Sequence, residues 1–221
     1  INCPTELYFR VHQRNERFKD TLGYAPADFR IAKRKEDGTF QPLVIKAGDL
    51  DDTAIFGHHA ITPTRHHRLF LKKAGEYVVR VKVHWPNDQK GKYTLSAYSY
   101  HKIEFKQISP IKNFLEKSFI NIGRRAKHRE EFENDCYIVR GFSGFNHYIY
   151  AKNEGNSTWT LTMTFADLEN ARLGKPYKSR YQQDTFEMVL KPGEEKATYL
   201  KILDPKTFES YIDPSFDNKW T

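Results

Sequence analysis

The feature that most limits how this chain can fold is an alternation of residue types between Tyr77 and Trp85, which only Val78 interrupts. Cationic or titratable side chains occupy alternate positions, at Arg80, Lys82 and His84. The positions between and around them carry large apolar side chains, at Tyr77, Val79, Val81, Val83 and Trp85. Successive residues of a strand point to opposite faces, so the pattern predicts a strand with one buried face. Such a strand needs a second layer of structure to cover its apolar side.

Similar alternation recurs in both halves of the sequence, separated by turn signals. Residues 6–14 alternate in strand fashion, Asp37-Gly38 marks a hairpin, and residues 46–67 read as a long irregular loop. Two turn segments resemble each other, LKKAGEY at 71–77 and LKPGEEK at 190–196. Short strands with regular turns predict β-sandwiches, and the repeated turn favours two related ones.

The hydrophobic period changes after Pro110, which itself suits the first turn of a helix. Apolar residues then fall at helical spacing, at Ile111, Phe114, Leu115, Phe119 and Ile122. We expect a helix over residues 110–133 that connects two domains. A helix lying on a membrane surface is the alternative, but its basic residues cluster at one end. The predicted fold is mainly β: two antiparallel β-sandwiches, residues 1–106 and 135–221, joined by an amphipathic helix within residues 107–134.

The net charge of +8 is unevenly distributed along the chain. Residues 1–106 carry 19 Lys and Arg against 12 Asp and Glu, whereas residues 107–221 carry 17 against 16. A basic half indicates an acidic partner, such as lipid headgroups or an acidic protein surface, although solubility alone also explains it. The basic segments RIAKRK and GRRAKHR are poor in aromatic residues, which argues against a nucleic-acid partner.

Two predicted strands place cations on the face that is not buried. One strand contributes Arg10, His12 and Arg14, and the other contributes Arg80, Lys82 and His84. If the two strands are neighbours, these six side chains form one patch that can hold an anionic surface. Each Lys or Arg near an anionic membrane contributes about 1 kcal/mol to binding. The alternative is an ordinary solvated strand face.

The predicted long loop carries an acidic cluster at Asp49, Asp51 and Asp52. Ca²⁺ takes about six to eight oxygen ligands, and Asp88 is the obvious further carboxylate from another loop. The cluster is therefore a candidate Ca²⁺ site, and Ca²⁺ is the cofactor that the sequence suggests. A salt-bridged or solvated acidic loop is the alternative.

Residues 6–105 resemble the C2-like β-sandwich domain of calpain-type proteins. The resemblance rests on FRVHQRNERFKD, YAPADFRIAKRKEDG, HRLFLKKAGEYVVRVKVHW and GKYTLSAYS, in that order and spacing. The second half shares LKPGEEK and a sandwich-like rhythm, as in tandem C2-like modules of divergent calpain-like proteins. The resemblance implies that a basic strand surface holds phosphoinositide headgroups. It also implies that the acidic loop pairs with basic strands or binds Ca²⁺.

A calpain-type protease core needs a thiolate nucleophile with a His and an Asn. Cys3 lies in NCPTEL and Cys136 in NDCYIVR, neither of which resembles the Gly- and Trp-flanked context of such nucleophiles. Two distant cysteines also form no disulfide framework, which favours a reduced, cytoplasmic location. We therefore expect a non-catalytic regulatory module that binds an anionic surface. Two alternatives stay open: the regulatory tail of a calpain-like cysteine protease, and a structural scaffold subunit of a cytoskeletal or ciliary protein assembly.

Overall fold

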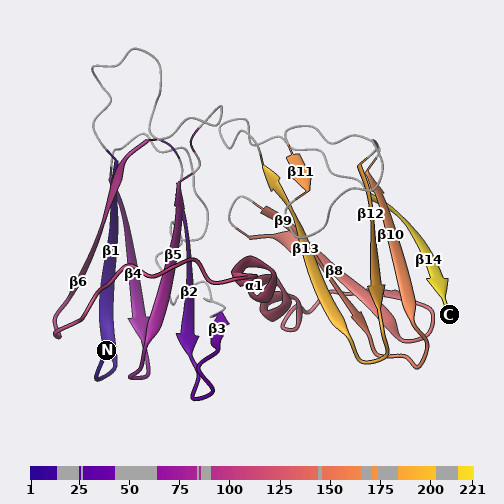
Figure 1. Cartoon of the computed structure of the whole chain (residues 1–221), viewed down its shortest axis with the longest axis horizontal. Helices are drawn as coiled ribbons and strands as arrows, with labels where there is room; N and C mark the ends of the chain where they lie inside the picture. Colours follow the sequence, from indigo (N-terminus) through magenta and orange to yellow (C-terminus); the bar gives the residue numbers. More distant parts are fainter. Residues whose placement is uncertain are drawn as a thin grey trace, which may run out of the picture. The chain divides into compact units, whose positions relative to one another are not determined.

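Strands account for most of the regular structure (Figure 1). The computed structural model describes residues 1–13, 25, 27–42, 64–83, 85, 91–143, 146–165, 171–173, 184–202 and 214–221. This part of the chain contains four antiparallel sheets and one α-helix, which confirms the prediction of a mainly β protein. The chain divides into two compact units, Ile1–Lys112 and Asn113–Thr221, called here the first and the second unit.

The strands of the first unit form two three-stranded sheets. One sheet has the order β4-β1-β6, with strands Thr64–Leu71, Thr5–Gln13 and Tyr93–Ser99. The other has the order β3-β2-β5, with strands Phe40–Pro42, Ala27–Arg34 and Tyr77–Val83. The predicted alternating strand is therefore confirmed over 77–83. Because β4 begins at residue 64, the loop predicted to reach residue 67 ends earlier, and residues 43–63 lie outside the described part.

The hairpin predicted at Asp37-Gly38 is confirmed between β2 and β3. Gly38 takes a φ of 77°, a left-handed conformation that favours glycine. Asp37 accepts a hydrogen bond on Oδ1 from the backbone N–H of Thr39 at 2.8 Å, which holds the turn closed.

The two sheets of the first unit share one apolar core. Its buried members are Leu7, Phe9, Ile31, Leu69 and Leu71, with Phe29, Tyr77 and Val79 packed against them. Along β1 every odd-numbered residue from 5 to 13 is buried, so one face of the strand points inward. Burying a side chain such as Leu or Phe stabilises the fold by about 1.5–3 kcal/mol. The arrangement is that of a β-sandwich.

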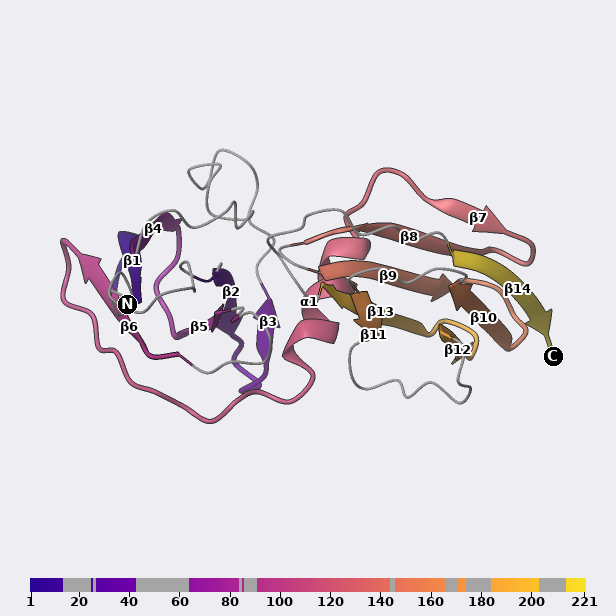
Figure 2. The ribbon, with the colours of Figure 1, turned by 90° about the horizontal axis from the view of Figure 1, so that it is seen from above.

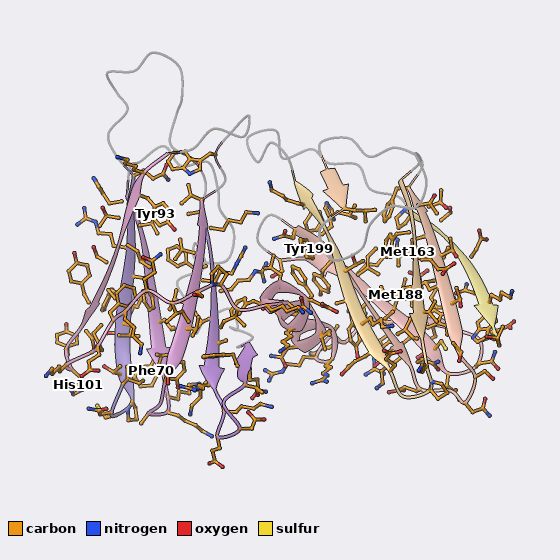
Figure 3. All side chains as sticks on the ribbon, in the orientation of Figure 1. Phe70, Tyr93, His101, Met163, Met188 and Tyr199 are labelled. Carbon is orange, nitrogen blue, oxygen red and sulfur yellow. The ribbon has the colours of Figure 1, made fainter. Side chains whose placement is uncertain are left out.

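The second unit also contains two sheets, one of three strands and one of five. The first has the order β12-β10-β14, with strands Asp184–Leu190, Trp159–Phe165 and Pro214–Trp220. The second has the order β11-β13-β9-β8-β7, with strands Ala171–Leu173, Glu195–Ile202, Asn146–Asn153, Cys136–Phe142 and Glu130–Phe132. Between the sheets lies a core that includes Met163 and Met188, both fully buried (Figure 3).

The helix α1, Phe114–Gly123, covers the other face of the five-stranded sheet (Figure 2). Its Phe119 stacks on Tyr148 of β9, with ring centroids 5.4 Å apart and planes inclined by 7°. The same ring packs against Tyr199 of β13 at 5.3 Å. The second unit is therefore built of three layers: a small sheet, a large sheet and a helix.

The helix is shorter than the predicted range of 110–133, and residues 130–132 form strand β7 instead. Pro110 lies before the helix rather than in its first turn. At the other end Arg124 turns toward β13, where its Nε donates to Glu195 Oε2 at 2.9 Å. The charged residues beyond Gly123 carry no apolar stripe, so they gain little from continuing the helix over the sheet. The prediction of a long connecting helix was wrong: α1 is a layer of the second unit.

Both units use one pattern of strand pairing. A central strand lies between two others in the small sheet, β1 between β4 and β6, and β10 between β12 and β14. In the first unit the residues opposite Leu7 are Leu69 and Ser99, which are 30 apart. In the second unit the residues opposite Leu161 are likewise 30 apart.

The shared pattern extends to the other sheet of each unit. Val81 of β5 lies opposite Phe29 of β2, and Leu200 of β13 lies opposite Leu173 of β11. Val81 and Leu200 are 119 positions apart, the same interval that separates Leu69 from its counterpart in β12. The two similar turns, LKKAGEY and LKPGEEK, therefore occupy equivalent places, where the chain passes from one sheet to the other.

A cross-strand hydrogen bond recurs at equivalent positions of the small sheets. The hydroxyl oxygens of Thr5 and Ser99 lie 2.9 Å apart in the first unit. In the second unit Trp159 Nε1 donates to Asn218 Oδ1 at 2.9 Å. The side chains differ, but the positions in the pairing register are the same, as a repeat of one architecture requires.

We predict that Gly123→Ala destabilises the second unit. A Cβ added there would lie 2.3 Å from Tyr150 Cγ, so the helix could no longer approach β9 as closely. The same change at an open helical site stabilises by about 1 kcal/mol. Here we expect the free energy of unfolding, measured in urea, to fall by about 2 kcal/mol through overpacking. Lys117→Ala, on the exposed face of α1, is the control and should change it by less than about 0.5 kcal/mol. A gain in stability for Gly123→Ala would contradict the contact.

A second prediction concerns His147 in β9, whose pKa burial lowers from 6.5 to about 4. At a pH between about 4 and 6.5, the imidazole of His147 binds a proton in the unfolded chain but not in the folded chain. The contribution to stability is therefore complete above pH 6.5 and is lost as the pH falls toward 4. Because solvent reaches part of the ring, we expect a loss of about 1 kcal/mol between about pH 7 and pH 5.

His147→Gln should remove that loss, as urea unfolding of both proteins at the two pH values would show. Glu195 does not interfere, because the Arg124 guanidinium lowers the pKa of its carboxyl below the usual 4.5. An unchanged pH dependence in the variant would show that the imidazole is not the group responsible.

Candidate anionic-surface site

The cations predicted on the first strand lie on the outward face of β1. Inward-pointing Leu7, Phe9 and Val11 are buried, and the residues between them point away from the core. Arg10 is half-buried on this outer face and His12 is exposed. Arg14 lies outside the described residues.

The second predicted set lies on β5. Tyr77 and Val79 pack against the core of the first unit, so the strand presents Arg80 and Lys82 on its other face. Both cations are half-buried. His84 lies outside the described residues.

The structure does not bring the two sets together on neighbouring strands. The strand that carries Arg10 pairs with β4 and β6, whereas the strand that carries Arg80 pairs with β2. They belong to two different sheets of the sandwich. The condition for one patch, that the two strands are neighbours, is therefore not met by the described strands β1 and β5.

Arg30 of β2 joins the surface on β5, although the sequence analysis did not select it. It lies directly opposite Arg80 in the antiparallel pair and is 9% exposed. The signal was present in the sequence, because Phe29 and Ile31 face the core and their neighbour must point outward. What the sequence could not show is that β2 and β5 pair in a register that places two arginines side by side.

Two like charges directly opposite each other destabilise a strand pair unless anionic groups compensate them. Lys82 adds a third cation on the same face, opposite the position of Asp28. Arg30, Arg80 and Lys82, called here the β2–β5 cation group, therefore lie together on one face of the pair β2–β5.

Two further cations lie at the end of this sheet, Arg34 and Lys33. Arg34 Nη1 donates to Glu76 Oε2 at 2.7 Å, and this hydrogen bond keeps the pKa of the Glu76 carboxyl below its usual value. Lys33 Nζ lies 5.8 Å from the centre of the Tyr77 ring, a cation–π contact. These contacts fix the β4–β5 turn against β2.

The candidate Ca²⁺ ligands Asp49, Asp51 and Asp52, with Asp88, lie outside the described residues. Within the part of the chain that the structure does describe, no three His, Cys, Asp or Glu side chains gather in a manner that would hold a metal ion. In that same part, no helix is long and apolar enough to cross a membrane.

Cys136 lies in a setting that disfavours a thiolate. Cys136 is 1% exposed in the core of the second unit, and its thiol donates a weak hydrogen bond to Asn153 Oδ1 at 3.4 Å. Burial raises the pKa of this thiol, which favours the protonated, unreactive form. Cys3 is half-buried before the start of β1.

The formal charge follows the division into units. The first unit contains 20 Lys and Arg against 12 Asp and Glu, and the second contains 16 of each. The net charge of +8 therefore lies wholly in the first unit, and the second is neutral.

No protein-family model matches the chain, and no curated protein matches it. Among solved structures, it is similar to the N-terminal CBM22-1–CBM22-2 tandem domain of Xyn10C from Paenibacillus barcinonensis. The sequence identity is 10% and the TM-score is 0.25, with all of this chain and 72% of the other covered. Neither a family nor a function follows from a likeness of this size.

The two thiols should differ in reactivity if Cys136 is as protected as its burial indicates. We expect iodoacetamide to modify Cys136 at least about tenfold more slowly than Cys3 in the folded protein. In urea the two rates should become similar, which provides the internal control. Mass spectrometry of tryptic peptides measures both rates, and faster modification of Cys136 in the folded state would point to a reactive thiol.

Proposed function

We propose that this chain is a non-catalytic binding module whose first unit holds an anionic surface, either phospholipid or an acidic protein. The observation that carries the proposal is the pairing of Arg30 with Arg80 beside Lys82. The neutrality of the second unit assigns the attraction to the first, because the whole net charge resides there.

The chemistry of the β2–β5 cation group suits phosphate or carboxylate. Guanidinium groups offer several N–H donors in a fixed plane and bind such anions through paired hydrogen bonds. The group lies on a sheet face, whose backbone is held by the pairing of β2 with β5. A rigid support of this kind lowers the entropic cost of presenting three cations together.

The resemblance to calpain-type C2-like domains is compatible with this function. In that interpretation the chain is a tandem C2-like regulatory module of a calpain-like protein, and the basic strand surface meets phosphoinositide headgroups. Ca²⁺ would act through the acidic residues at 49–52, which offer carboxylate oxygens of the kind that the ion prefers.

A second function, a scaffold subunit in a cytoskeletal or ciliary assembly, is favoured by a different observation. Phe70 (Figure 3) and Tyr98 lie on the outward face of the sheet β4-β1-β6 and are 49% and 52% exposed. Exposed rings on a sheet face are typical of protein interfaces. This function predicts stable association with other proteins and no binding to vesicles.

The test is sedimentation with phosphatidylcholine vesicles that contain phosphatidylserine, with and without Ca²⁺. Binding to immobilised polyglutamate tests the alternative that the anionic surface is an acidic protein. Because each cation near an anionic membrane contributes about 1 kcal/mol, Arg80→Glu/Lys82→Glu should weaken binding at least about 30-fold.

The matched control is Lys191→Glu/Lys219→Glu, which changes the net charge equally but at exposed positions of the second unit. It should bind within about threefold of wild type if the attraction is local to the first unit. Equal losses of binding in both double variants would show that binding depends on the net charge of the chain and not on the position of the cations. Unchanged binding in the β5 variant would remove the β2–β5 cation group from the function.

A further inference from the structure

The charges of the second unit are separated by sign along one segment, residues 124–135. Residues 124–129, called here the basic turn, contain four Lys or Arg and one His, and their sequence holds no acidic residue. Residues 130–135, called here the acidic segment, contain four Asp or Glu, and their sequence holds no basic residue. The neutrality of the whole unit, with 16 residues of each sign, therefore conceals a strong local separation of charge.

The basic turn begins where the helix α1 ends. The backbone N–H of Arg125 donates to the carbonyl oxygen of Ile122 at 3.0 Å, and the N–H of Ala126 donates to that of Gly123 at 3.1 Å. These hydrogen bonds close two tight turns that lead the chain away from the helix. Figure 2 shows the chain passing from α1 to β7, the strand that pairs with β8.

Side chains hold both ends of the basic turn against the five-stranded sheet. At its start, Arg124 Nε donates to Glu195 Oε2 of β13 at 2.9 Å. At its end, the guanidinium carbon of Arg129 lies 4.2 Å from the centre of the Tyr137 ring of β8. The residues between these two anchors therefore present their side chains from a supported backbone, which lowers the entropic cost of binding.

The acidic segment is anchored to the other side of the same sheet. The ring of Phe132 packs against Trp159, with centroids 5.6 Å apart, and an oxygen of Glu130 lies 2.9 Å from a guanidinium nitrogen of Arg140. Glu131 lies directly opposite Tyr137 in the pair β7–β8. Residues directly opposite each other share a face of the sheet, so Glu131 lies on the face where Arg129 covers the Tyr137 ring.

Both sets of charges face solvent. Arg125 and Lys127 of the basic turn are exposed. Glu131, Glu133 and Asp135 of the acidic segment are exposed as well. The second unit thus presents a positive surface and a negative surface side by side, each on a backbone fixed by its own anchors.

A surface of this kind is matched by a partner that carries the opposite order of charges. A second copy of the same segment, related by a two-fold axis, supplies that order, because two-fold contacts bring each patch against the same patch reversed. We infer that two copies of this chain associate through residues 124–135, with the basic turn of each copy against the acidic segment of the other.

A partner of uniform negative charge fits this surface less well. An anionic membrane or a purely acidic protein segment that reached Arg125 and Lys127 would also approach Glu131 and Glu133, and like charges brought together oppose binding. In the pair of copies each sign meets its opposite twice, and two neutral second units have no net repulsion. Because the charges are exposed, the association should be reversible and sensitive to salt.

This inference goes beyond the proposed function, because it concerns the second unit, whereas binding to an anionic surface is assigned to the first. Arg80→Glu/Lys82→Glu should therefore self-associate like the wild type. Vesicle binding can fail while self-association holds, and the reverse, so the two proposals are tested separately.

The test is analytical ultracentrifugation of the full chain over a range of protein concentrations. The wild type should form a dimer whose dissociation constant rises at least about tenfold between about 50 mM and about 500 mM NaCl. Arg125→Glu/Lys127→Glu makes both surfaces acidic, and Glu131→Lys/Glu133→Lys makes both basic. Each variant alone should dimerise at least about tenfold more weakly than the wild type at the lower salt concentration.

The mixture of these two variants is the decisive sample. Each surface of one variant then meets the opposite sign on the other, so an equimolar mixture should form heterodimers about as stable as the wild-type dimer. The variant that carries all four changes should again dimerise with itself, for the same reason. Either rescue also shows that the variants are folded.

Matched controls change the same number of exposed charges elsewhere in the second unit. They are Lys191→Glu/Lys219→Glu and Glu154→Lys/Asp217→Lys, and both should dimerise within about threefold of the wild type.

Several results would overturn the inference. A wild type that stays monomeric up to about 100 μM protein at the lower salt concentration would exclude the second copy as the partner. A dimer that neither the mixture nor the fourfold variant restores would show that the basic turn and the acidic segment do not face each other. Equal losses in the control variants would assign the effect to net charge. A monomeric wild type whose binding to immobilised polyglutamate is lost in Arg125→Glu/Lys127→Glu would assign the basic turn to an acidic protein instead.

Discussion

The structure depends on one constraint: every long strand must bury one face against an opposing sheet while the chain passes from sheet to sheet. In each unit the central strand of the small sheet contributes to the core, with Phe9 in β1 and Met163 in β10. Its two neighbours are tied together by a fixed interval along the chain. The residues that pair with one position of the central strand are 30 residues apart along the chain. This interval allows the chain to cross once to the other sheet, form β5 or β13 there, and return.

On this common frame the two units treat the outer face of the second sheet differently. In the second unit Tyr148, Tyr150 and Tyr199 lie under α1, and Phe119 packs among them. The Tyr150 hydroxyl donates to Glu195 Oε2 at 2.8 Å, and Arg124 binds the same carboxylate, so the helix end is anchored. In the first unit the same sheet carries Arg30 and Arg80. One unit thus uses this face for its own stability, and the other retains charge there.

Much of the local structure was predictable because it depends on neighbouring residues. The alternation in Tyr77–Val83 predicts the strand, and Asp37-Gly38 predicts the hairpin. Helical spacing located α1 but not its end, where the side chain of Arg124 binds Glu195, 71 residues further on. Which strands become neighbours depends on contacts of this long range. For that reason the sequence could not show that the strands of Arg10 and Arg80 belong to different sheets, and it missed the pairing of Arg80 with Arg30.

The common register of the two units has a consequence for how the protein reaches its native state. During synthesis, β10 meets partners, β4 and β6, with the same spacing as its own, which invites exchange of central strands between units. Side-chain volume opposes such an exchange. Trp159 is fully buried where β1 has the much smaller Thr5, so a misplaced β10 would force an indole into a space shaped for a hydroxyl and a methyl group. The two units share a topology, so the different volumes of their core side chains keep each central strand paired with the strands of its own unit.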